Sequence, residues 1–430
     1  MNTAVFTSTD GGDSLAEVVR TVLHSLRHAA PGVDVQLMCF AFTDPEIAGE
    51  LLALLRARPD ITVRVIADWS QSAANSPTVL RDLAAAGLPN FRLRFKIDLP
   101  YAWDRARGRL IYSYARSAGM MHHKTVCLRR AGTPFLMLCG SYNWSARGRQ
   151  AYENVLVLDA GPDHRPVLSA FDAEFRAMWE DDSITATPER ARAIFRALCH
   201  AAASGLDLDD PVALADALEL PRPTLMQRPS GGARTPADGP CLAAFSGGYA
   251  LSTRESAGHS PSNDRRSIAL LRDGGKRRPA PLTLNTLTLE AIRSVPDGAT
   301  LKVAMYALSN RVPEFQALIG AARRGCRVQL LLDRKINGRG AQRLESMARE
   351  GGLPIAVRTT RRRMHQKYLC CPETGMLLTG TANMTLEATL RHADHRILFR
   401  CAPELAAAFA QDFDTIWHRV SHLAVMPTAA

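Results

Sequence analysis

Two short segments of the sequence place a lysine two residues after a histidine. The first reads MHHK and contains His122 and Lys124, and the second reads MHQK and contains His365 and Lys367. Because side chains alternate between the two faces of a β-strand, a histidine and a lysine at this spacing lie on one face. A neutral imidazole can attack phosphorus near neutral pH, and a second imidazole can protonate the leaving oxygen. The paired segments therefore predict two histidines that act on one phosphate group.

Each histidine–lysine segment is followed by an apolar run, then by Gly-Ser/Thr-x-Asn and a carboxylate. These residues are Ser141, Asn143 and Glu153 after the first segment, and Thr381, Asn383 and Asp394 after the second. Lysines and asparagines supply positive charge and hydrogen-bond donors for phosphoryl oxygens. A carboxylate can hold an imidazole in one tautomer through its other ring nitrogen, and we expect the short Asp394 side chain to reach His365. We predict that the six His, Lys and Asn residues are catalytic and that the other four support them.

The chain contains an internal repeat. Segments 33–70 and 299–336 align, and each has the pattern of a strand, an amphipathic helix and a second strand that ends in Asp68 or Asp333. Strands that alternate with helices predict an α/β fold of βαβ units in a mostly parallel sheet with helices on its faces. Two such lobes, related by a pseudo-twofold axis, would bring both histidines to one phosphate. We therefore expect one active site in a single chain, with no obligate dimer.

The repeat and the composition define four regions. We predict a first lobe at 1–185, a helical extension at 186–220, a linker rich in Pro, Gly, Ser and Arg at 221–281, and a second lobe at 282–425. The first lobe carries extra residues within 90–121, just before its histidine–lysine segment. This insertion, with several Arg and aromatic residues, is either a substrate-binding lid or an excursion without a role.

Composition limits the class of protein. The chain has 430 residues, 46% of them hydrophobic, and its apolar runs are shorter than a membrane-spanning helix. The first residues lack the basic and apolar regions of a signal peptide. Nine cysteines without a C-x-x-C pair are predicted to be free thiols, which favours a reducing compartment and a cytoplasmic location. His392 and His395 flank Asp394, a pattern that would be compatible with a metal site.

The balance of charged residues is basic. Lys and Arg exceed Asp and Glu by 53 to 42, which gives a formal charge of +11. This excess is compatible with a solvated surface, with nucleic acid, or with an anionic membrane surface as the partner. Three consecutive arginines, Arg361, Arg362 and Arg363, stand just before the second histidine–lysine segment. They are candidate substrate-binding residues for phosphates that flank the reacting one, or a solvated strand edge.

The duplicated H-x-K…N signature resembles that of the phospholipase D superfamily. The segments AFTDPEIAGELL, VRVIADWSQ and GSYNWS in the first half are most similar to the bacterial endonuclease-like branch. The resemblance implies two tandem phospholipase D-like lobes, catalysis without metal or cofactor, and a phosphohistidine intermediate, with His122 as nucleophile and His365 as acid. The chain departs from the family where an aspartate five residues after each lysine is replaced by Arg129 and Pro372.

These observations predict a phosphodiesterase that acts on nucleic acid. The alternative is a phospholipase D or phosphatidyltransferase that acts on phospholipid head groups at a membrane surface. The chain offers no long amphipathic segment rich in Trp and Phe for docking to a membrane, which disfavours this alternative. A third class, a binding protein with decayed sites, is disfavoured because both histidine–lysine–asparagine sets are intact.

Overall fold

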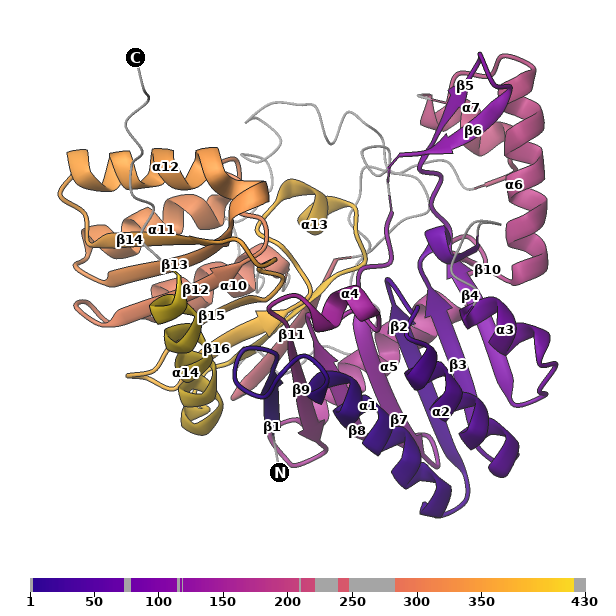
Figure 1. Ribbon diagram of the computed structural model, residues 1–430, viewed down its shortest axis with the longest axis horizontal. Helices are drawn as coiled ribbons and strands as arrows, with labels where there is room; N and C mark the ends of the chain where they lie inside the picture. The colour runs from indigo at the N-terminus through magenta and orange to yellow at the C-terminus, as the bar shows by residue number, and fades with distance from the viewer. Residues whose placement is uncertain are drawn as a thin grey trace, which may run out of the picture.

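The computed structural model describes residues 3–72, 79–113, 117, 119–208, 210–220, 239–246 and 283–420. These residues form two α/β lobes that lie side by side, the first drawn in indigo to magenta and the second in orange to yellow (Figure 1). None of the helices within the described ranges is both long and apolar enough to cross a membrane. Most of the predicted linker at 221–281, and the end of the chain, lie outside the described residues.

The first lobe is built on an eight-stranded sheet with the order β1-β9-β8-β7-β2-β3-β4-β10. Its strands are β1 (Thr3–Phe6), β2 (Val33–Cys39), β3 (Thr62–Ala67), β4 (Phe91–Lys96), β7 (Lys124–Arg130), β8 (Thr133–Gly140), β9 (Asn154–Asp159) and β10 (Thr185–Ala186). Parallel pairing is confined to β2-β3-β4, and every other pair is antiparallel. The short turn between β7 and β8 permits only an antiparallel return.

The second lobe repeats this plan in a seven-stranded sheet with the order β11-β17-β16-β15-β12-β13-β14. Its strands are β11 (Cys241–Phe245), β12 (Thr300–Met305), β13 (Arg327–Asp333), β14 (Ile355–Thr360), β15 (Lys367–Cys371), β16 (Met376–Gly380) and β17 (His395–Phe399). Parallel pairing is again confined to three strands, β12-β13-β14. The predicted α/β class with two tandem lobes is confirmed, and the sheets are mixed because the strands that carry the site residues return as hairpins.

Helices cover both faces of each sheet. They are α1 (Ser14–Ser25), α2 (Pro45–Ala57), α3 (Val79–Ala85) and α5 (Arg165–Trp179) in the first lobe, with α10 (Leu284–Arg293), α11 (Pro313–Arg323), α12 (Arg334–Glu350) and α14 (Pro403–Arg419) in the second. Short helices are η1 (Leu26–His28), η2 (Trp69–Ser72), α4 (Ala146–Arg149) and α13 (Leu386–Leu390). In α2, Asp44 caps the first turn by accepting hydrogen bonds from Glu46 N and Ile47 N, while Pro45 begins the helix.

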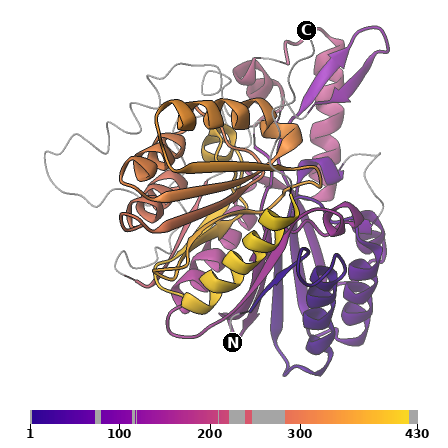
Figure 2. The same cartoon turned by 60° about the vertical axis from the view of Figure 1, so that its left-hand side comes forward.

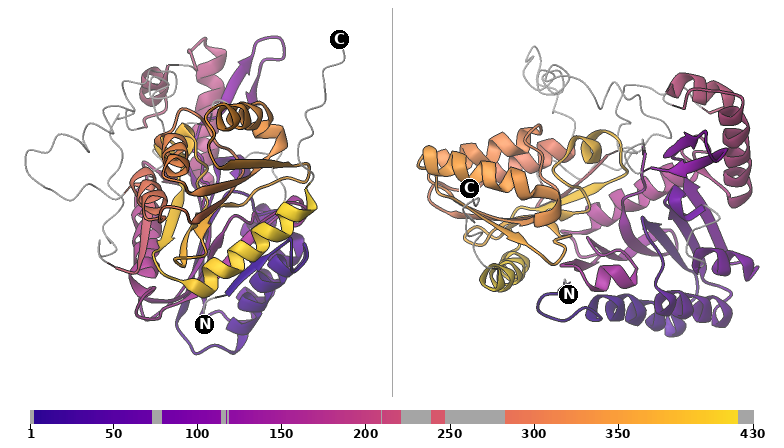
Figure 3. Two further views of the ribbon diagram at one scale, coloured as in Figure 1. Left: turned by 90° about the vertical axis from the view of Figure 1, so that its left-hand side faces the viewer. Right: turned by 45° about the horizontal axis from the view of Figure 1, so that its top comes forward.

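The two lobes share a hydrophobic core. One cluster of buried side chains combines Phe171 and Phe175 of α5 with Phe409 and Phe413 of α14. Helix α5 contacts β11 of the second lobe, and α14 contacts β1 of the first, so each of these equivalent helices packs on both sheets. Figures 2 and 3 show α14, in yellow, running beside the indigo elements of the first lobe. The shared core fixes the relative position of the two lobes.

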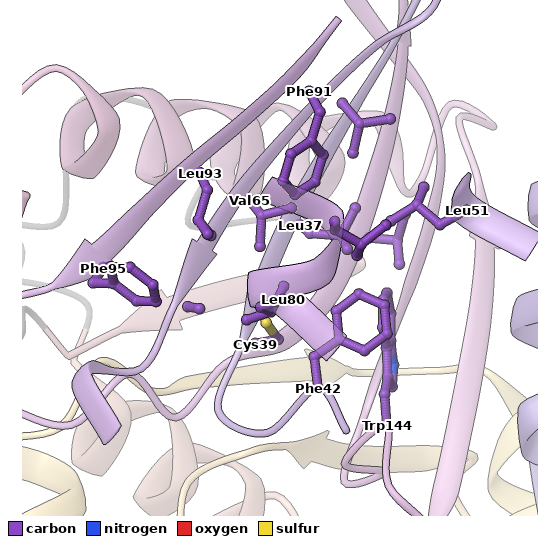
Figure 4. Close-up of a cluster of buried hydrophobic side chains, with 14 of the residues drawn as sticks. Leu37, Cys39, Phe42, Leu51, Val65, Leu80, Phe91, Leu93, Phe95 and Trp144 are labelled. Carbon is purple, nitrogen blue, oxygen red and sulfur yellow. The ribbon is translucent and has the colours of Figure 1, made fainter. Parts of the chain in front are cut away.

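A separate core supports the first lobe. Figure 4 shows Leu37, Val65 and Leu93, from three neighbouring strands, packed with Leu51 of α2. Full burial of a side chain of this size contributes about 1.5–3 kcal/mol to the free energy of folding, compared with leaving it exposed. These contacts make the sheet a rigid support for the polar residues at its strand ends.

The range 221–281, predicted as linker, contains a strand of the second lobe. β11 pairs antiparallel with β17 along the sheet edge, as β1 pairs with β9 in the first lobe. The second lobe thus begins with a strand that the linker-like composition concealed, because five residues between Gly- and Ser-rich segments leave little apolar signal. In the range 186–220, α6 (Pro188–Ala203) and α7 (Pro211–Ala217) are helical, and both contribute to the core of the first lobe.

The predicted insertion at 90–121 contains β4 and a separate hairpin of β5 (Tyr101–Asp104) and β6 (Arg109–Tyr112). The ring of Tyr101 lies 5.4 Å from that of Phe195 on α6, so the hairpin packs on the helical extension. Figure 1 shows it projecting beside α6 and α7. Its role as a substrate-binding lid stays a prediction.

Candidate active site

The two histidine–lysine segments meet where the lobes join. Met121 forms a β-bridge with Ala393, and Met364 forms one with Tyr152. His122 N donates a hydrogen bond of 3.0 Å to Ala393 O, and His365 N donates one of 3.0 Å to Tyr152 O. The backbone of each histidine is therefore held by the opposite lobe. This symmetric exchange is the pseudo-twofold relation that the repeat predicts.

The aspartates that end the repeated strands position these segments. Asp68 accepts a hydrogen bond of 2.9 Å from Met121 N, and Asp333 accepts one of 3.1 Å from Met364 N. Both carboxylates are buried. The two residues were recognised in the sequence only as landmarks of the repeat. In the fold, each fixes the residue that precedes a histidine.

Each histidine is paired with a carboxylate of the other lobe. His122 Nδ1 lies 2.7 Å from Asp394 Oδ1, and His365 Nδ1 lies 2.7 Å from Glu153 Oε1. The expectation that Asp394 reaches His365 is therefore wrong: the pairs are crossed. The reason is the interlobe backbone exchange, which brings residue 393 beside residue 121 and residue 152 beside residue 364. With Nδ1 donating to a carboxylate, Nε2 is the nitrogen left for a substrate.

The two lysines lie beneath the histidines. Lys124 Nζ donates a hydrogen bond of 2.7 Å to His122 O, and Lys367 Nζ donates one to His365 O. Each ammonium also lies over an aromatic ring, Phe40 at 5.4 Å and Tyr306 at 5.3 Å. Burial lowers the pKa of Lys124 to about 8, and burial also lowers the pKa of Lys367. At neutral pH Lys124 is mostly protonated, and its positive charge lies where water is largely excluded, which strengthens its effect on an anion.

The remaining predicted residues divide into two groups. Asn143 and Asn383 have buried side-chain oxygens without a hydrogen-bond partner among the described residues. Ser141 Oγ accepts a hydrogen bond of 3.0 Å from Asn154 N, and Thr381 Oγ1 accepts one of 3.1 Å from His395 N. Both hydroxyls therefore brace the start of the strand that follows each carboxylate. The amides have the freedom to contact a substrate.

The predicted arginine cluster does not act as one unit. Arg362 donates hydrogen bonds to Gln150 O and Ala151 O, at 2.8 and 3.0 Å, and its guanidinium lies 4.7 Å from the centroid of the Tyr152 ring. Arg362 therefore links the two lobes, and its role as a substrate-binding residue stays a prediction. Arg361 is exposed. Arg363 is also exposed and stacks on Tyr306 at 4.8 Å.

The environments of the two histidine pairs differ. Burial lowers the pKa of His122 to about 4. Burial opposes ionisation of Asp394, but the adjacent His122 outweighs it and holds the pKa of Asp394 well below its ordinary value. Burial raises the pKa of Glu153 to about 7, against the lowering effect of Lys367. At neutral pH, His122 is thus a neutral imidazole beside an ionised carboxylate, while the Glu153–His365 pair holds a proton that it can release near pH 7.

A third imidazole at the site was not predicted to take part. The ring of His392 lies 6.0 Å from that of His122, and His392 Nδ1 is 3.9 Å from Asp394 Oδ2. The corresponding residue in the first lobe is Ala151, at the same distance before the carboxylate. His123, by contrast, faces away from the site as alternation predicts, and its ring stacks on that of His395 at 5.1 Å. In the described part of the chain, no group of three or more His, Cys, Asp or Glu side chains could hold a metal ion.

Comparisons with known proteins agree with the duplicated site. The sequence matches the family described as "Cardiolipin synthase, PLD-like domain" twice, over residues 22–179 and 296–417. The chain therefore belongs to the phospholipase D superfamily, with two tandem domains. It is an enzyme of the phosphodiesterase type that characterises this superfamily. A comparison with curated proteins found no match.

Several solved structures align with this chain, and the first two described share its fold. Phosphatidylserine synthase from Haemophilus influenzae superposes with a TM-score of 0.62 at 12% identity, covering 98% of this chain and 87% of that one. Polyphosphate kinase from Porphyromonas gingivalis gives a TM-score of 0.50 at 11% identity, covering 96% and 49%. Nuc, a phospholipase D family member from Salmonella typhimurium, gives a TM-score of 0.29 at 18% identity, covering 42% and 95%.

Proposed function

We propose that this protein cleaves phosphodiester bonds of nucleic acid through a phosphohistidine intermediate. The observation that carries the chemistry is the pair of crossed histidine–carboxylate contacts, His122–Asp394 and His365–Glu153, at 2.7 Å each. Two imidazoles, each with one nitrogen tied and the other directed to the site, suit a nucleophile and an acid on opposite sides of one phosphorus atom.

The first step uses His122 as nucleophile. Its Nε2 lone pair forms a bond to phosphorus, and the bond between phosphorus and the leaving oxygen breaks. The proton of the Glu153–His365 pair passes from His365 to that oxygen. His122 suits this role because its pKa of about 4 leaves the imidazole neutral. The raised pKa of Glu153, about 7, suits a pair that must keep a proton until the bond breaks.

The second step returns the enzyme to its starting state. His365, which has given up its Nε2 proton, takes a proton from water while the water oxygen bonds to phosphorus. The bond between phosphorus and His122 breaks, and the phosphate product leaves. Lys124, Lys367, Asn143 and Asn383 contact the phosphoryl oxygens, where negative charge is concentrated in both steps. No metal ion or cofactor is needed for this balance of bonds and protons.

Three features support nucleic acid as the substrate class. The chain carries a formal charge of +11, Arg361 and Arg363 are exposed next to the segment of His365, and the first-half segments are similar to endonuclease-like relatives. A polyanion gains affinity from each neutralised phosphate through release of counterions. A cytoplasmic location accords with nine cysteines that would remain free thiols in a reducing compartment.

A second candidate is a phospholipase D or phosphatidyltransferase that acts at an anionic membrane surface. The family description names cardiolipin synthase, and one relative of similar fold is a phosphatidylserine synthase. The histidine chemistry is common to both candidates. The candidates differ in the substrate that must enter the site. A nuclease would bind a flexible nucleic-acid strand, and a phospholipase D or phosphatidyltransferase would bind a lipid head group.

One experiment separates the candidates. Purified protein is incubated in EDTA with single- or double-stranded DNA, with RNA, or with vesicles of phosphatidylcholine and cardiolipin. We expect nucleic acid to be cut and the vesicles to persist. Consumption of lipid with nucleic acid untouched at low salt would replace the first candidate with the second.

A further inference from the structure

A pocket of about 290 Å³ opens in the second lobe, between α12 and the loop that follows β12. Helix α12 lies across this lobe in Figure 1. The floor of the pocket is apolar and its rim is polar. Leu308, Phe315, Leu332 and Leu344 provide the apolar side chains, and Ser309, Asn310, Asn337, Arg339 and Arg343 provide the polar ones. No part of the mechanism above uses this pocket.

The pocket is connected to the active site through Asn337. Asn337 Nδ2 donates a hydrogen bond of 2.7 Å to Tyr306 O, and Asn337 Oδ1 accepts one of 2.9 Å from Leu308 N. The ring of Tyr306 in turn lies 5.0 Å from the ring of His365. The pocket thus stands behind Tyr306 at the carboxyl end of β13, where open α/β sheets commonly bind ligands.

Two positions beside the pocket have aromatic counterparts in the first lobe. The bridge between Leu308 and Met384 in the second lobe corresponds to the bridge between Phe42 and Trp144 in the first. The Phe42 and Trp144 rings pack edge to face, with centroids 5.1 Å apart, and Figure 4 shows the two side chains next to each other. Trp69, which follows the strand-end aspartate, is fully buried. The second lobe has the smaller side chains of Leu308 and Met384 at the positions of Phe42 and Trp144, and Leu308 lines the pocket.

The rim carries positive charge beside the apolar floor. Arg339 and Arg343 are exposed and lie one turn apart on α12, so both guanidinium groups can reach the same anion. Phe315 and the leucines offer a surface on which a planar ring can stack. A planar ring joined to a phosphate is a nucleotide. A volume of about 290 Å³ lies near the lower limit for small-molecule pockets, which fits one such unit.

We propose that this pocket binds one nucleotide of the substrate strand, next to the scissile phosphate on the side of the second lobe. The base lies on the floor formed by Phe315 and Leu344, and its phosphate contacts Arg339 and Arg343. This inference rests on the proposed function, because a lipid substrate would not supply the base. It extends that function by setting the orientation of the substrate strand. Only the nucleotide on one side of the scissile phosphate would have a pocket.

Two pairs of matched variants test the proposal. R339Q/R343Q removes two charges from the rim, and R323Q/R349Q removes two exposed arginines from the last turns of α11 and α12. Gly340→Leu fills the pocket from a lining position with open space around its Cβ. Gly338→Leu is its control, because Gly338 has the same open space but does not line the pocket.

The variants are compared in cleavage of a single-stranded oligonucleotide and of bis(4-nitrophenyl) phosphate, which has no flanking nucleotide. We expect both pocket variants to lose about tenfold or more in kcat/KM on the oligonucleotide, as for the loss of one stacked base, and to keep their rate on the small ester. Both controls should match the unaltered protein on both substrates. If the pocket variants also match their controls on the oligonucleotide, the pocket proposal is overturned while the proposed function stands. If the unaltered protein cuts no nucleic acid, both fail together.

Discussion

His122 Nδ1 of the first lobe lies 2.7 Å from Asp394 Oδ1 of the second lobe. The contact is repeated in the opposite sense by His365 and Glu153. Neither lobe therefore holds a histidine together with its own carboxylate, and each half of the repeat completes the other. A relative movement of the lobes would break both pairs at once, which explains why the shared core around α5 and α14 matters for chemistry as well as stability.

The crossed pairs predict that replacing a carboxylate will impair the histidine of the opposite lobe, which it contacts. Asp394→Asn should slow formation of the phosphohistidine on His122, by about 10²-fold or more, because the amide no longer fixes the reactive tautomer. Glu153→Gln should instead impair protonation of the leaving oxygen by His365. Rapid-quench measurement of the intermediate, with substrates of good and poor leaving groups, separates the two. If Asp394→Asn behaved as a His365 defect, the crossed assignment would fail.

Loss of either histidine should abolish turnover. His122→Ala and His365→Ala each remove a group that the two-step mechanism requires, so less than about a tenth of the activity should remain, given that acid–base catalysis alone contributes about 10²–10⁴-fold. Mixing the two inactive variants tests whether one chain holds the whole site. We expect little recovery of activity, since both histidines meet within a single chain. Substantial recovery would mean that the site forms between chains.

The activity should have a bell-shaped dependence on pH. It should rise with pH as His122, with a pKa of about 4, loses its proton and becomes nucleophilic. It should fall above about pH 7, where the Glu153–His365 pair loses the proton needed by the leaving oxygen. The profile of kcat/KM measures these groups in the free enzyme. Glu153→Gln is the informative variant: an alkaline limb that did not move would assign that limb to another group.

The fold and the principal site residues could be predicted from the sequence because they leave local signals. A strand–helix–strand repeat and two H-x-K segments are periodic patterns, and each half contains a full copy. The crossed pairing left no such signal, since it depends on how two lobes join. The hidden strand β11 is too short for a compositional signal, and the interlobe role of Arg362 is invisible in a run of three arginines. Pairing across the lobes is set by tertiary packing, on which the spacing of residues within one half has no bearing.

The contribution of His122 and His123 to stability should increase as the pH rises from about 4 towards 6.5. Burial lowers the pKa of His123 to about 3 and that of His122 to about 4. Over this interval these two imidazoles bind more protons in the unfolded chain than in the folded one, so their contribution to the free energy of unfolding increases with pH, whereas buried Glu153, whose pKa is raised, acts in the opposite direction. His123→Gln copies Gln366 at the matching position and should reduce the slope. Urea unfolding at a series of pH values measures the slope, and an unchanged slope would show that His123 does not contribute to it.

Arg361 and Arg362 have different contacts, so we predict that replacing one weakens the salt dependence of binding and replacing the other lowers stability. Arg361→Gln removes an exposed charge and should lower the slope of log binding constant against log salt by about 0.7 on single strands and 0.9 on duplex DNA. Arg362→Gln removes hydrogen bonds to Gln150 O and Ala151 O. It should therefore lower the free energy of unfolding by about 1–3 kcal/mol and leave the salt slope unchanged.

Fluorescence anisotropy of a labelled oligonucleotide, with His122→Ala as the background to prevent cleavage, measures the slope. Chemical unfolding of the same proteins measures stability, and Arg323→Gln, distant from the site on α11, is the control for both. The two arginines stand side by side in the sequence and carry the same charge, so composition predicts equal effects for them. A loss of salt dependence in Arg362→Gln equal to that in Arg361→Gln, with stability unchanged, would mean that Arg362 binds substrate and that its interlobe contacts are dispensable.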